Sequence, residues 1–354
     1  MVRFGSKLRV GLDVGSHSIK AVVVERVGQR YRVVNRGLRE IYTGTQVYDP
    51  DGAKRSQIVP LMLDLFKEFR LQPKKLKNVR TVISGAQVAA KEIVALPLSK
   101  TEMDSAMILE ARKHIPLDGS ETQVDYQVLG EHAKEPDKVR VLVVATTKKL
   151  FSAHMEALHQ LEINPLIVDI EPLAMVNSFL TFNEVPDEGV IVLMNIGCRR
   201  TGVSIFGRRD MFFSREIPVA GAMFTDELMK EYGLDYHRAE EVKYEQGISP
   251  DLPKAKADDG GLRLASRSVI EKFGDEVNRT LRYYVKETSQ SYFTRFILMG
   301  GGAHIKELQE FLARKFNVGV EEYDPFARLE LVGGNGGGHP AQYSAAVGVA
   351  IREE

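Results

Sequence analysis

Two short polar turns, one in each half of the chain, carry residue types that can bind a phosphorylated ligand. In the first, Gly11-Leu-Asp-Val-Gly-Ser-His-Ser18, Asp13 ends an apolar run and Gly15 follows two residues later. A carboxylate at the end of a strand can hold Mg²⁺ through water, and glycine with short hydroxyl residues lets backbone N–H groups approach phosphate oxygens. The second turn, Asn195-Ile-Gly-Cys-Arg-Arg-Thr201, repeats the pattern with an amide in place of the acid.

Taken alone, an Asp-x-Gly-Ser sequence is also an ordinary hairpin turn. The repetition favours a ligand site, since two similar hairpins would face each other across a cleft and hold one polyphosphate from both sides. Glu171 lies between them at a strand-to-helix junction, where it can orient a water molecule or simply complement the helix dipole. Met299-Gly-Gly-Gly302 follows an apolar strand, and glycine there allows a base or a phosphate to approach closely.

Composition excludes several classes of protein. A chain of 354 residues is longer than one hydrophobic core tends to support, so we expect at least two lobes. Lysine plus arginine and aspartate plus glutamate each total 48, which leaves no surplus positive charge for nucleic acid or an anionic bilayer. The single cysteine, Cys198, fits a reducing compartment. Without a signal peptide or a run of roughly 18 apolar residues, the sequence predicts a cytoplasmic protein.

The histidines give no metal-binding motif. His154 and His159 are five residues apart, so on a helix they point to different faces. The other histidines are scattered along the sequence.

Hydrophobic periodicity predicts the elements that position the two turns. Strands are expected over residues 7–14, 18–27, 30–40, 81–97, 122–130, 139–146, 164–170, 190–206 as a hairpin, 211–217 and 296–299. Helices are expected over residues 57–70, 99–115, 148–161, 222–232, 236–246 and 265–288, with a final helix from Pro340. Ser99-Lys-Thr-Glu102 predicts a capping box, and Pro116 should end that helix.

Because the opening three-strand pattern resumes near residue 190, the segment between the copies is an insertion. We expect a first lobe of residues 1–85, 166–187 and 340–354, an inserted α/β subdomain at 86–165, and a second lobe at 188–339. A polar loop at 248–262 and a glycine-rich linker at 333–339 interrupt the second lobe.

The order of these segments resembles the actin, sugar-kinase and heat-shock chaperone superfamily. The motifs that carry the resemblance are residues 11–15, 168–174, 195–197, 299–302 and 343–350. Within the superfamily the chain is most similar to the PilM family of type IV pilus assembly proteins, relatives of the division protein FtsA. Residues 110–116, 124–130 and 141–147 resemble that family's inserted subdomain. The resemblance covers essentially the whole chain and implies an α/β, actin-like (ribonuclease H-like) fold with two lobes and a nucleotide cleft.

The resemblance also implies ATP and Mg²⁺ between the lobes. Asp13 would lie near Mg²⁺, and Glu171 would orient the attacking water. The other residues implied to contact the nucleotide are Gly15, Ser16, His17, Ser18, Lys20, Asn195, Gly197, Thr201, Gly221, Glu240, Lys243, Gly300, Gly301, Gly302 and Ile305. Glu240 and Lys243 match positions that face ribose and adenine in relatives, while the alternative for them is a helical i,i+3 ion pair worth about 0.2–0.5 kcal/mol.

Two departures from the superfamily pattern bear on hydrolysis. Asn195 stands where the second hairpin usually carries aspartate, and an amide can neither supply negative charge to a Mg²⁺ shell nor accept a proton as a base. Ala220-Gly221 replaces a pair of glycines, which places a methyl group where a phosphate would approach. We therefore expect ATP binding with slow or absent hydrolysis and leave open whether the protein is an enzyme.

For partners, the resemblance implies that a groove bordered by the insert binds the cytoplasmic N-terminal tail of PilN. The chain would then be a scaffold, peripheral to the inner membrane, that joins the membrane-embedded pilus platform to its motor proteins and meets the membrane only through them. No nucleic acid is expected. The sequence stops at Glu354, soon after the expected final helix, so we expect no FtsA-type membrane-targeting helix. The alternatives are an active ATPase, an FtsA-like filament former and a related type II secretion component.

Overall fold

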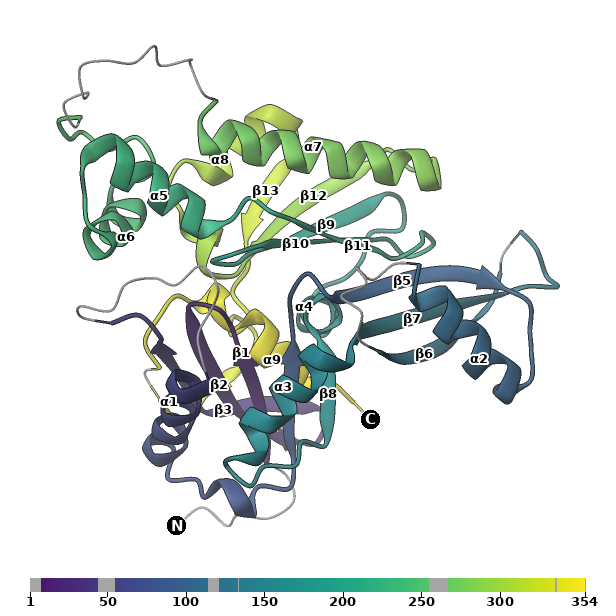
Figure 1. The fold of residues 1–354 in the computed structure, drawn as a ribbon. Helices are drawn as coiled ribbons and strands as arrows, with labels where there is room; N and C mark the ends of the chain where they lie inside the picture. Colours follow the sequence, from purple (N-terminus) through teal and green to yellow (C-terminus); the bar gives the residue numbers. More distant parts are fainter. Residues whose placement is uncertain are drawn as a thin grey trace.

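The protein is described here by a computed structural model that covers residues 8–43, 55–113, 121–132, 134–254, 267–334 and 336–353. Two β-sheets form its frame, with the first lobe at the bottom of Figure 1, the second at the top, and the insert extending to one side. Among the described residues, no helix combines the length and the apolar character needed to cross a bilayer.

The first sheet lies in the first lobe and includes a run of consecutive β-branched residues, Val22, Val23 and Val24. Its strands are β1 (Leu8–Val14), β2 (Ser18–Val27), β3 (Arg30–Glu40), β4 (Val79–Ile83), β8 (Ile167–Ile170) and β14 (Glu330–Leu331). Their order is β14-β3-β2-β1-β4-β8. Successive side chains of β2 point to opposite faces, so Val23 packs under helices α1 (Arg55–Glu68) and α3 (Lys148–His159) while Val22 packs under α9 (Ser344–Ile351). The sheet therefore has a hydrophobic core on both faces.

Helix α9 packs unusually close to its neighbours. It lies between β1 and α4 (Glu171–Leu180). A Cβ atom added at Gly11 would lie 2.0 Å from the carbonyl oxygen of Ala346, and one at Gly348 would lie 1.8 Å from that of Ala174. Glycine is required at both positions because no side chain fits between the two backbones.

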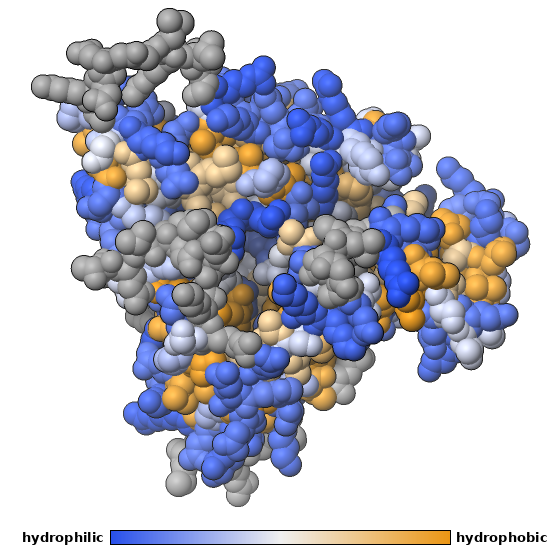
Figure 2. Space-filling model, in the orientation of Figure 1, coloured by the Kyte–Doolittle hydropathy of each residue, from blue (hydrophilic) through white to orange (hydrophobic). Residues whose placement is uncertain are grey.

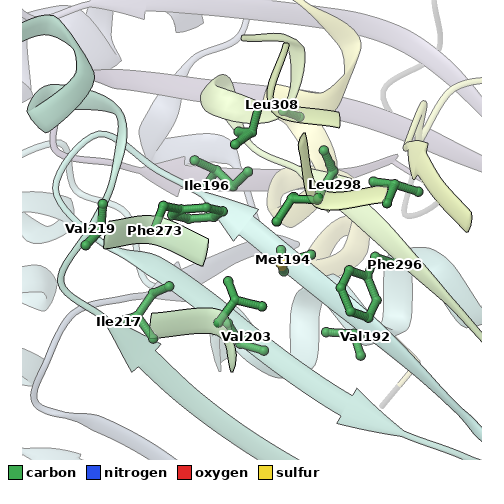
Figure 3. Close-up of a cluster of buried hydrophobic side chains, with 14 of the residues drawn as sticks. Val192, Met194, Ile196, Val203, Ile217, Val219, Phe273, Phe296, Leu298 and Leu308 are labelled. Carbon is green, nitrogen blue, oxygen red and sulfur yellow. The ribbon is translucent and has the colours of Figure 1, made fainter. Parts of the chain in front are cut away.

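The second sheet contains strands of both the second lobe and the insert. Its strands are β5 (Val88–Ala95), β6 (Thr122–Glu131), β7 (Val139–Thr147), β9 (Val190–Ile196), β10 (Thr201–Phe206), β11 (Phe213–Ile217), β12 (Phe293–Met299) and β13 (Gly319–Glu322). Their order is β13-β12-β9-β10-β11-β5-β7-β6. Figure 3 shows Met194 and Ile196 of β9 in one buried cluster with Phe273 and Phe296.

Helices cover this sheet in separate places. Helices α7 (Val269–Thr288) and α8 (Leu308–Phe316) supply the core of the second lobe, and α2 (Lys100–Ala111) covers the insert through Met103 and Met107. The pair α5 (Gly221–Tyr232) and α6 (Tyr236–Glu245) forms a small cluster of its own. The short 3₁₀ helices are η1 (Pro73–Lys75), η2 (Gly301–His304) and η3 (Pro340–Tyr343).

The insert is joined to the second lobe at one narrow contact. Strand β5 pairs with β11 at a single register position, Lys91 opposite Phe213. The buried carboxylate of Glu92 accepts a hydrogen bond from the Phe212 N–H at 2.8 Å, and the Ser214 hydroxyl donates to the Ala90 carbonyl at 3.2 Å. A segment that leaves the first lobe thus extends the sheet of the second.

Most of the predicted elements are confirmed, and three differ from the prediction. The predicted strand over 81–97 is wrong, because Gly85 at a φ of +128° breaks it into β4 and β5, which belong to different sheets. The helix predicted to reach residue 115 ends at Ala111 and begins with the expected capping box at Ser99, while Pro116 lies outside the described residues. The final helix begins at Ser344, after the 3₁₀ turn that starts at Pro340.

Packing also bears on the lobe boundaries. Ala157 and Leu158 of α3 are buried in the same cluster as Phe66 of α1, so this helix shares the core of the first lobe. Strand β14 pairs with β3 of the first sheet. We therefore propose an insert of residues 86–147, narrower than 86–165, and a first lobe that also takes in β14.

Candidate functional site

The two polar turns have the same backbone form. The Gly15 N–H donates to the Ser18 carbonyl at 3.1 Å, and the Gly197 N–H donates to the Arg200 carbonyl at 3.1 Å. Each turn therefore joins two antiparallel strands through the same glycine-centred hydrogen bond. The repeat seen in the sequence is a repeat of structure.

The residues opposite the key polar side chains differ between the turns. Lys20 is opposite Asp13, and its Nζ lies 3.2 Å from Asp13 Oδ2. Gly202 is opposite Asn195, and a Cβ there would lie 3.2 Å from Oε1 of Glu171. Glycine at this position leaves room for Glu171, which is hydrogen-bonded to the Asn195 side chain. One wall thus carries an ion pair and the other an acid–amide pair.

Both turns line one cleft of about 970 Å³. Parallel pairing of β1, β4 and β8 brings their carboxyl ends to a common edge, so Asp13, Ser84 and Glu171 meet there. The predicted residues that line the cleft are Asp13, Gly15, Ser16, His17, Ser18, Lys20, Glu171, Asn195, Gly197, Gly221, Glu240, Lys243, Gly300, Gly301 and Gly302.

Two predicted residues lie elsewhere. The hydroxyl of Thr201 is buried and donates to the Val219 carbonyl at 2.8 Å, and Ile305 is part of the hydrophobic core of the second lobe. Neither is among the described residues that line the cleft. Polar lining residues that sequence reasoning missed include Arg199, Arg200, Glu216, Tyr236, Tyr244 and Gln342. Arg199 and Arg200 belong to the second turn itself, so its sequence could have predicted that they line the cleft.

Among the carboxyl groups that line the cleft, Glu171 has a strongly raised pKa. Burial raises the pKa of Glu171 to about 7, the hydrogen bond from Asn195 lowers it, and the charge of Asp13 raises it further. Both protonation states of this carboxyl are therefore populated near neutral pH.

His17 is neutral at the same pH. Burial lowers the pKa of His17 to about 4, more than the nearby charge of Glu240 raises it. Its ring lies between those of Tyr42 and Tyr236, with centroids 6.3 and 6.4 Å away. The positive charge of the first turn therefore comes from Lys20, and His17 offers an uncharged ring.

Glu240 and Lys243 form the helical ion pair that the sequence left as an alternative. Lys243 Nζ lies 2.5 Å from Glu240 Oε1 and 2.8 Å from the hydroxyl of Thr225 on α5. The Lys243 side chain is only 2% exposed, so the pair holds α6 against α5. Both residues also line the cleft, which makes the structural role and a binding role compatible.

The three glycines after β12 have different roles. Gly300 has a φ of +81°, and a Cβ there would lie 2.2 Å from Asn195 Oδ1. A Cβ at Gly302 would lie 2.3 Å from Cγ2 of Ile196. Both are therefore needed for packing η2 against β9. At Gly301 the nearest atom, Gln342 Nε2, is 3.4 Å away, so this glycine is the one open to a ligand.

The cleft fits a nucleotide with a bound cation. On one wall it presents the carboxylate of Asp13 and the ammonium of Lys20, and on the other the glycine turns at Gly197 and Gly221. A Cβ at Gly221 would lie 3.1 Å from the Gly197 carbonyl oxygen, so the two backbones meet without side chains between them. Oxygen ligands suit Mg²⁺, and turns without side chains let a phosphate approach the backbone closely.

Two sheets, a repeated hairpin in each and a cleft between them define the actin-like class of two-lobe proteins. The chain belongs to the PilM family of type IV pilus assembly proteins, whose profile matches residues 11–354.

Solved structures agree on the fold. A structure described as the PilM-PilN type IV pilus biogenesis complex is similar at a TM-score of 0.77 and 22% identity, with 97% of each chain covered. The ethanolamine utilization protein EutJ from Carboxydothermus hydrogenoformans has a TM-score of 0.56 and 15% identity, covering 98% of this chain and 90% of that one. MreB5 of Spiroplasma citri bound to AMPPNP has a TM-score of 0.50 and 15% identity, covering 98% and 96%.

Proposed function

We propose that this chain is a cytoplasmic ATP-binding scaffold of the type IV pilus inner-membrane platform, which docks on the N-terminal tail of PilN and hydrolyses ATP weakly or not at all. The observation that carries the proposal is the convergence of both polar turns on one cleft. Membership of the PilM family, the similarity to a PilM–PilN complex and the similarity to an AMPPNP-bound MreB support it.

In this proposal Asp13 holds Mg²⁺, and Lys20 and the glycine turns contact the phosphates. Bound Mg²⁺ would neutralise part of the triphosphate charge. Gly301 and Tyr244 line the part of the cleft beside α6, where the nucleoside would lie. Both walls are needed, so the nucleotide would also fix the distance between the lobes.

The residues around Asn195 favour ATP binding over ATP hydrolysis. Asn195 adds no negative charge near a cation, and it hydrogen-bonds Glu171. An active ATPase is the second candidate function. It is favoured by the pKa of about 7 at Glu171, since a general base works best with a pKa near the operating pH.

Asp13→Asn should remove the Mg²⁺-dependent part of nucleotide binding. Ligand at 100 times its Kd stabilises a protein by about 2.7 kcal/mol, so ATP with Mg²⁺ should raise the unfolding midpoint of the unmodified chain. The variant should respond equally to ATP with and without Mg²⁺. Thermal unfolding with ATP, ADP and EDTA measures this effect, and phosphate release in the same samples decides between scaffold and ATPase.

Asp187→Asn is the matched control, because Asp187 is a surface acid with a side chain that is 84% exposed. It should behave like the unmodified chain. A chain that shows no midpoint shift with any adenine nucleotide would refute the nucleotide proposal, and full Mg²⁺ dependence in Asp13→Asn would refute the role of Asp13.

A second groove, of about 680 Å³, is the place we propose for the PilN tail. It is bordered by β5 of the insert and by β10 and β11 of the second lobe, with Phe213 and Tyr283 among its lining residues. Glu171 and Gly202 line both this groove and the nucleotide cleft. An extended peptide here would contact the insert and the second lobe at once.

Tyr283→Ala should weaken binding of a peptide of PilN's first residues. The Tyr283 side chain is 44% exposed and its ring lies 5.8 Å from that of Phe213 in the groove. Removing one aromatic contact costs about 1–3 kcal/mol, or roughly 5- to 150-fold in Kd. Fluorescence anisotropy with a labelled peptide measures the change.

The matched control is Tyr292→Ala, since Tyr292 is 60% exposed and is not among the described residues that line the groove. Equal losses in both variants would place the tail elsewhere. Absence of peptide binding well above micromolar concentration would refute docking on PilN.

The outer surface of the insert supports a scaffold role. Figure 2 shows apolar side chains gathered over this part of the molecule. The exposed large apolar residues there are Leu96, Leu98, Ile108, Leu109, Val128 and Leu129. Contiguous exposed apolar surface of this kind typically marks contacts between proteins. Further platform or motor proteins are the partners we propose for it, and the chain would reach the inner membrane through them.

A further inference from the structure

Three potential metal ligands from separate elements converge outside the cleft. His304 ends η2, Glu322 ends β13 and His339 immediately precedes η3. One ligand atom from each lies within 4.8 Å of the other two. His339 Nδ1 is 2.8 Å from Glu322 Oε1, and the rings of His304 and His339 are stacked with centroids 4.1 Å apart. The three residues are far apart in the sequence and near each other only in the fold.

The polar atoms of this cluster are incompletely satisfied. Within the described part of the chain, His304 Nδ1 is buried and has no hydrogen-bond partner. Glu322 Oε1 and His339 Nδ1 are also buried, and they lie 2.8 Å from each other as an ion-pair contact. A buried polar atom left unpaired costs about 1–3 kcal/mol. A cation held by the three residues would satisfy His304 Nδ1 and replace the contact between the other two.

The chemistry of the donors suits a transition metal. A neutral imidazole offers a ring-nitrogen lone pair to a metal ion, and a carboxylate offers an oxygen. The side chains of His339 and Glu322 are 36% and 28% exposed, which gives an ion a path from solvent. Two imidazoles and one carboxylate are a ligand set found around Zn²⁺.

We propose that His304, Glu322 and His339 bind one divalent transition-metal ion, with Zn²⁺ the best fit, and leave a fourth position to water. Tetrahedral Zn²⁺ with bonds of about 2.0–2.1 Å needs its ligand atoms about 3.4 Å apart. One ligand atom from each residue lies within 4.8 Å of the other two, so these atoms must move closer together. One of the two stacked rings must also turn out of the stack, so that a ring nitrogen of each histidine points at the same ion.

A bound ion would link two segments of the chain at the place where it passes from the second lobe to the first. His304 and Glu322 belong to the second lobe, and His339 begins the segment that enters the first lobe through η3 and α9. The Gly300 N–H already donates to the Ala341 carbonyl at 2.9 Å, so the two segments touch. His304 also stacks on Tyr244, a cleft residue, with ring centroids 4.4 Å apart. The proposed site therefore adjoins the cleft without being part of it.

Metal binding by the full, tag-free chain tests the proposal. After chelator treatment, calorimetric titration with Zn²⁺ should show one saturable site, and Co²⁺ should give the visible absorption of a tetrahedral complex. Zn²⁺ should also raise the unfolding midpoint. His339→Gln and Glu322→Gln should each lose the saturable binding and the Co²⁺ spectrum, while their metal-free unfolding midpoints stay close to that of the unmodified chain.

Three control variants separate this site from other metal-binding groups. His159→Gln removes an exposed histidine, Cys198→Ser removes the thiol in the cleft, and Asp13→Asn removes the acid proposed for Mg²⁺. All three should bind Zn²⁺ like the unmodified chain. The proposal is overturned if no saturable binding occurs, if His339→Gln binds normally, or if only Cys198→Ser or Asp13→Asn loses the metal. None of these outcomes depends on nucleotide or peptide binding.

Discussion

Gly348→Ala should destabilise the fold by at least about 3 kcal/mol, since overpacking against rigid backbone lies at the upper end of its usual cost. The added methyl group would lie 1.8 Å from the Ala174 carbonyl oxygen and 3.1 Å from Cβ of Ser178. Helices α9 and α4 would have to move apart. Helix propensity alone predicts the opposite sign, because alanine is favoured over glycine by about 1 kcal/mol within a helix. Urea unfolding followed by circular dichroism gives the difference.

Gly319→Ala is the matched control for this prediction. Gly319 begins β13, and no atom of the described chain lies within 4 Å of the Cβ that the substitution adds. Its stability should change by no more than about 0.5 kcal/mol, as for most surface substitutions. A Gly348→Ala variant as stable as the unmodified chain would contradict the close packing of α9.

Glu171→Gln should stabilise the protein at pH 8 and change little at pH 5. The carboxyl has a pKa of about 7 in the native state and 4.5 as its unperturbed value, because burial disfavours the ionised form. Native stability is therefore lost as pH rises from 4.5 through 7, and the loss is complete above 7. This shift corresponds to about 3 kcal/mol, so the uncharged glutamine should recover roughly 2–3 kcal/mol at pH 8.

Urea unfolding at pH 5, 6, 7 and 8 measures this pH dependence. Glu184→Gln serves as the control, since Glu184 is an exposed acid on the surface, and its effect should be small at every pH. If Glu171→Gln changes stability equally at pH 5 and pH 8, the carboxyl is not held in the environment described here. The same variant should also lose any phosphate release that the unmodified chain shows.

Sequence reasoning correctly predicted the local structure of the two polar turns. The hairpin around Asp13 and its copy around Asn195 were visible because strand periodicity, a turn glycine and a polar side chain occur at the same spacing in both. Parallel pairing then fixes which strand ends meet, and this brings Glu171 to the cleft.

The differences from the sequence predictions have physical causes that one sequence does not contain. Thr201 and Ile305 are buried away from the described lining of the cleft, because whether a side chain faces a cleft or a core depends on the packing of a neighbouring layer. The split of residues 81–97 depends on the unusual φ at Gly85, which glycine permits but does not require. His304 and His339 looked scattered because 35 positions separate them, and only the pairing of β12 with β13 and the return of the chain through η3 bring them together.

The single register pair between β5 and β11 joins the strands of the insert to those of the second lobe in one sheet. Along the chain, β5 also follows β4 of the first lobe, so the insert is attached to both lobes. A force applied to the insert by a partner would therefore load this pair. Because the strands within the insert pair at many positions and β5 with β11 at one, we expect the contact between Lys91 and Phe213 to open before the insert itself unfolds.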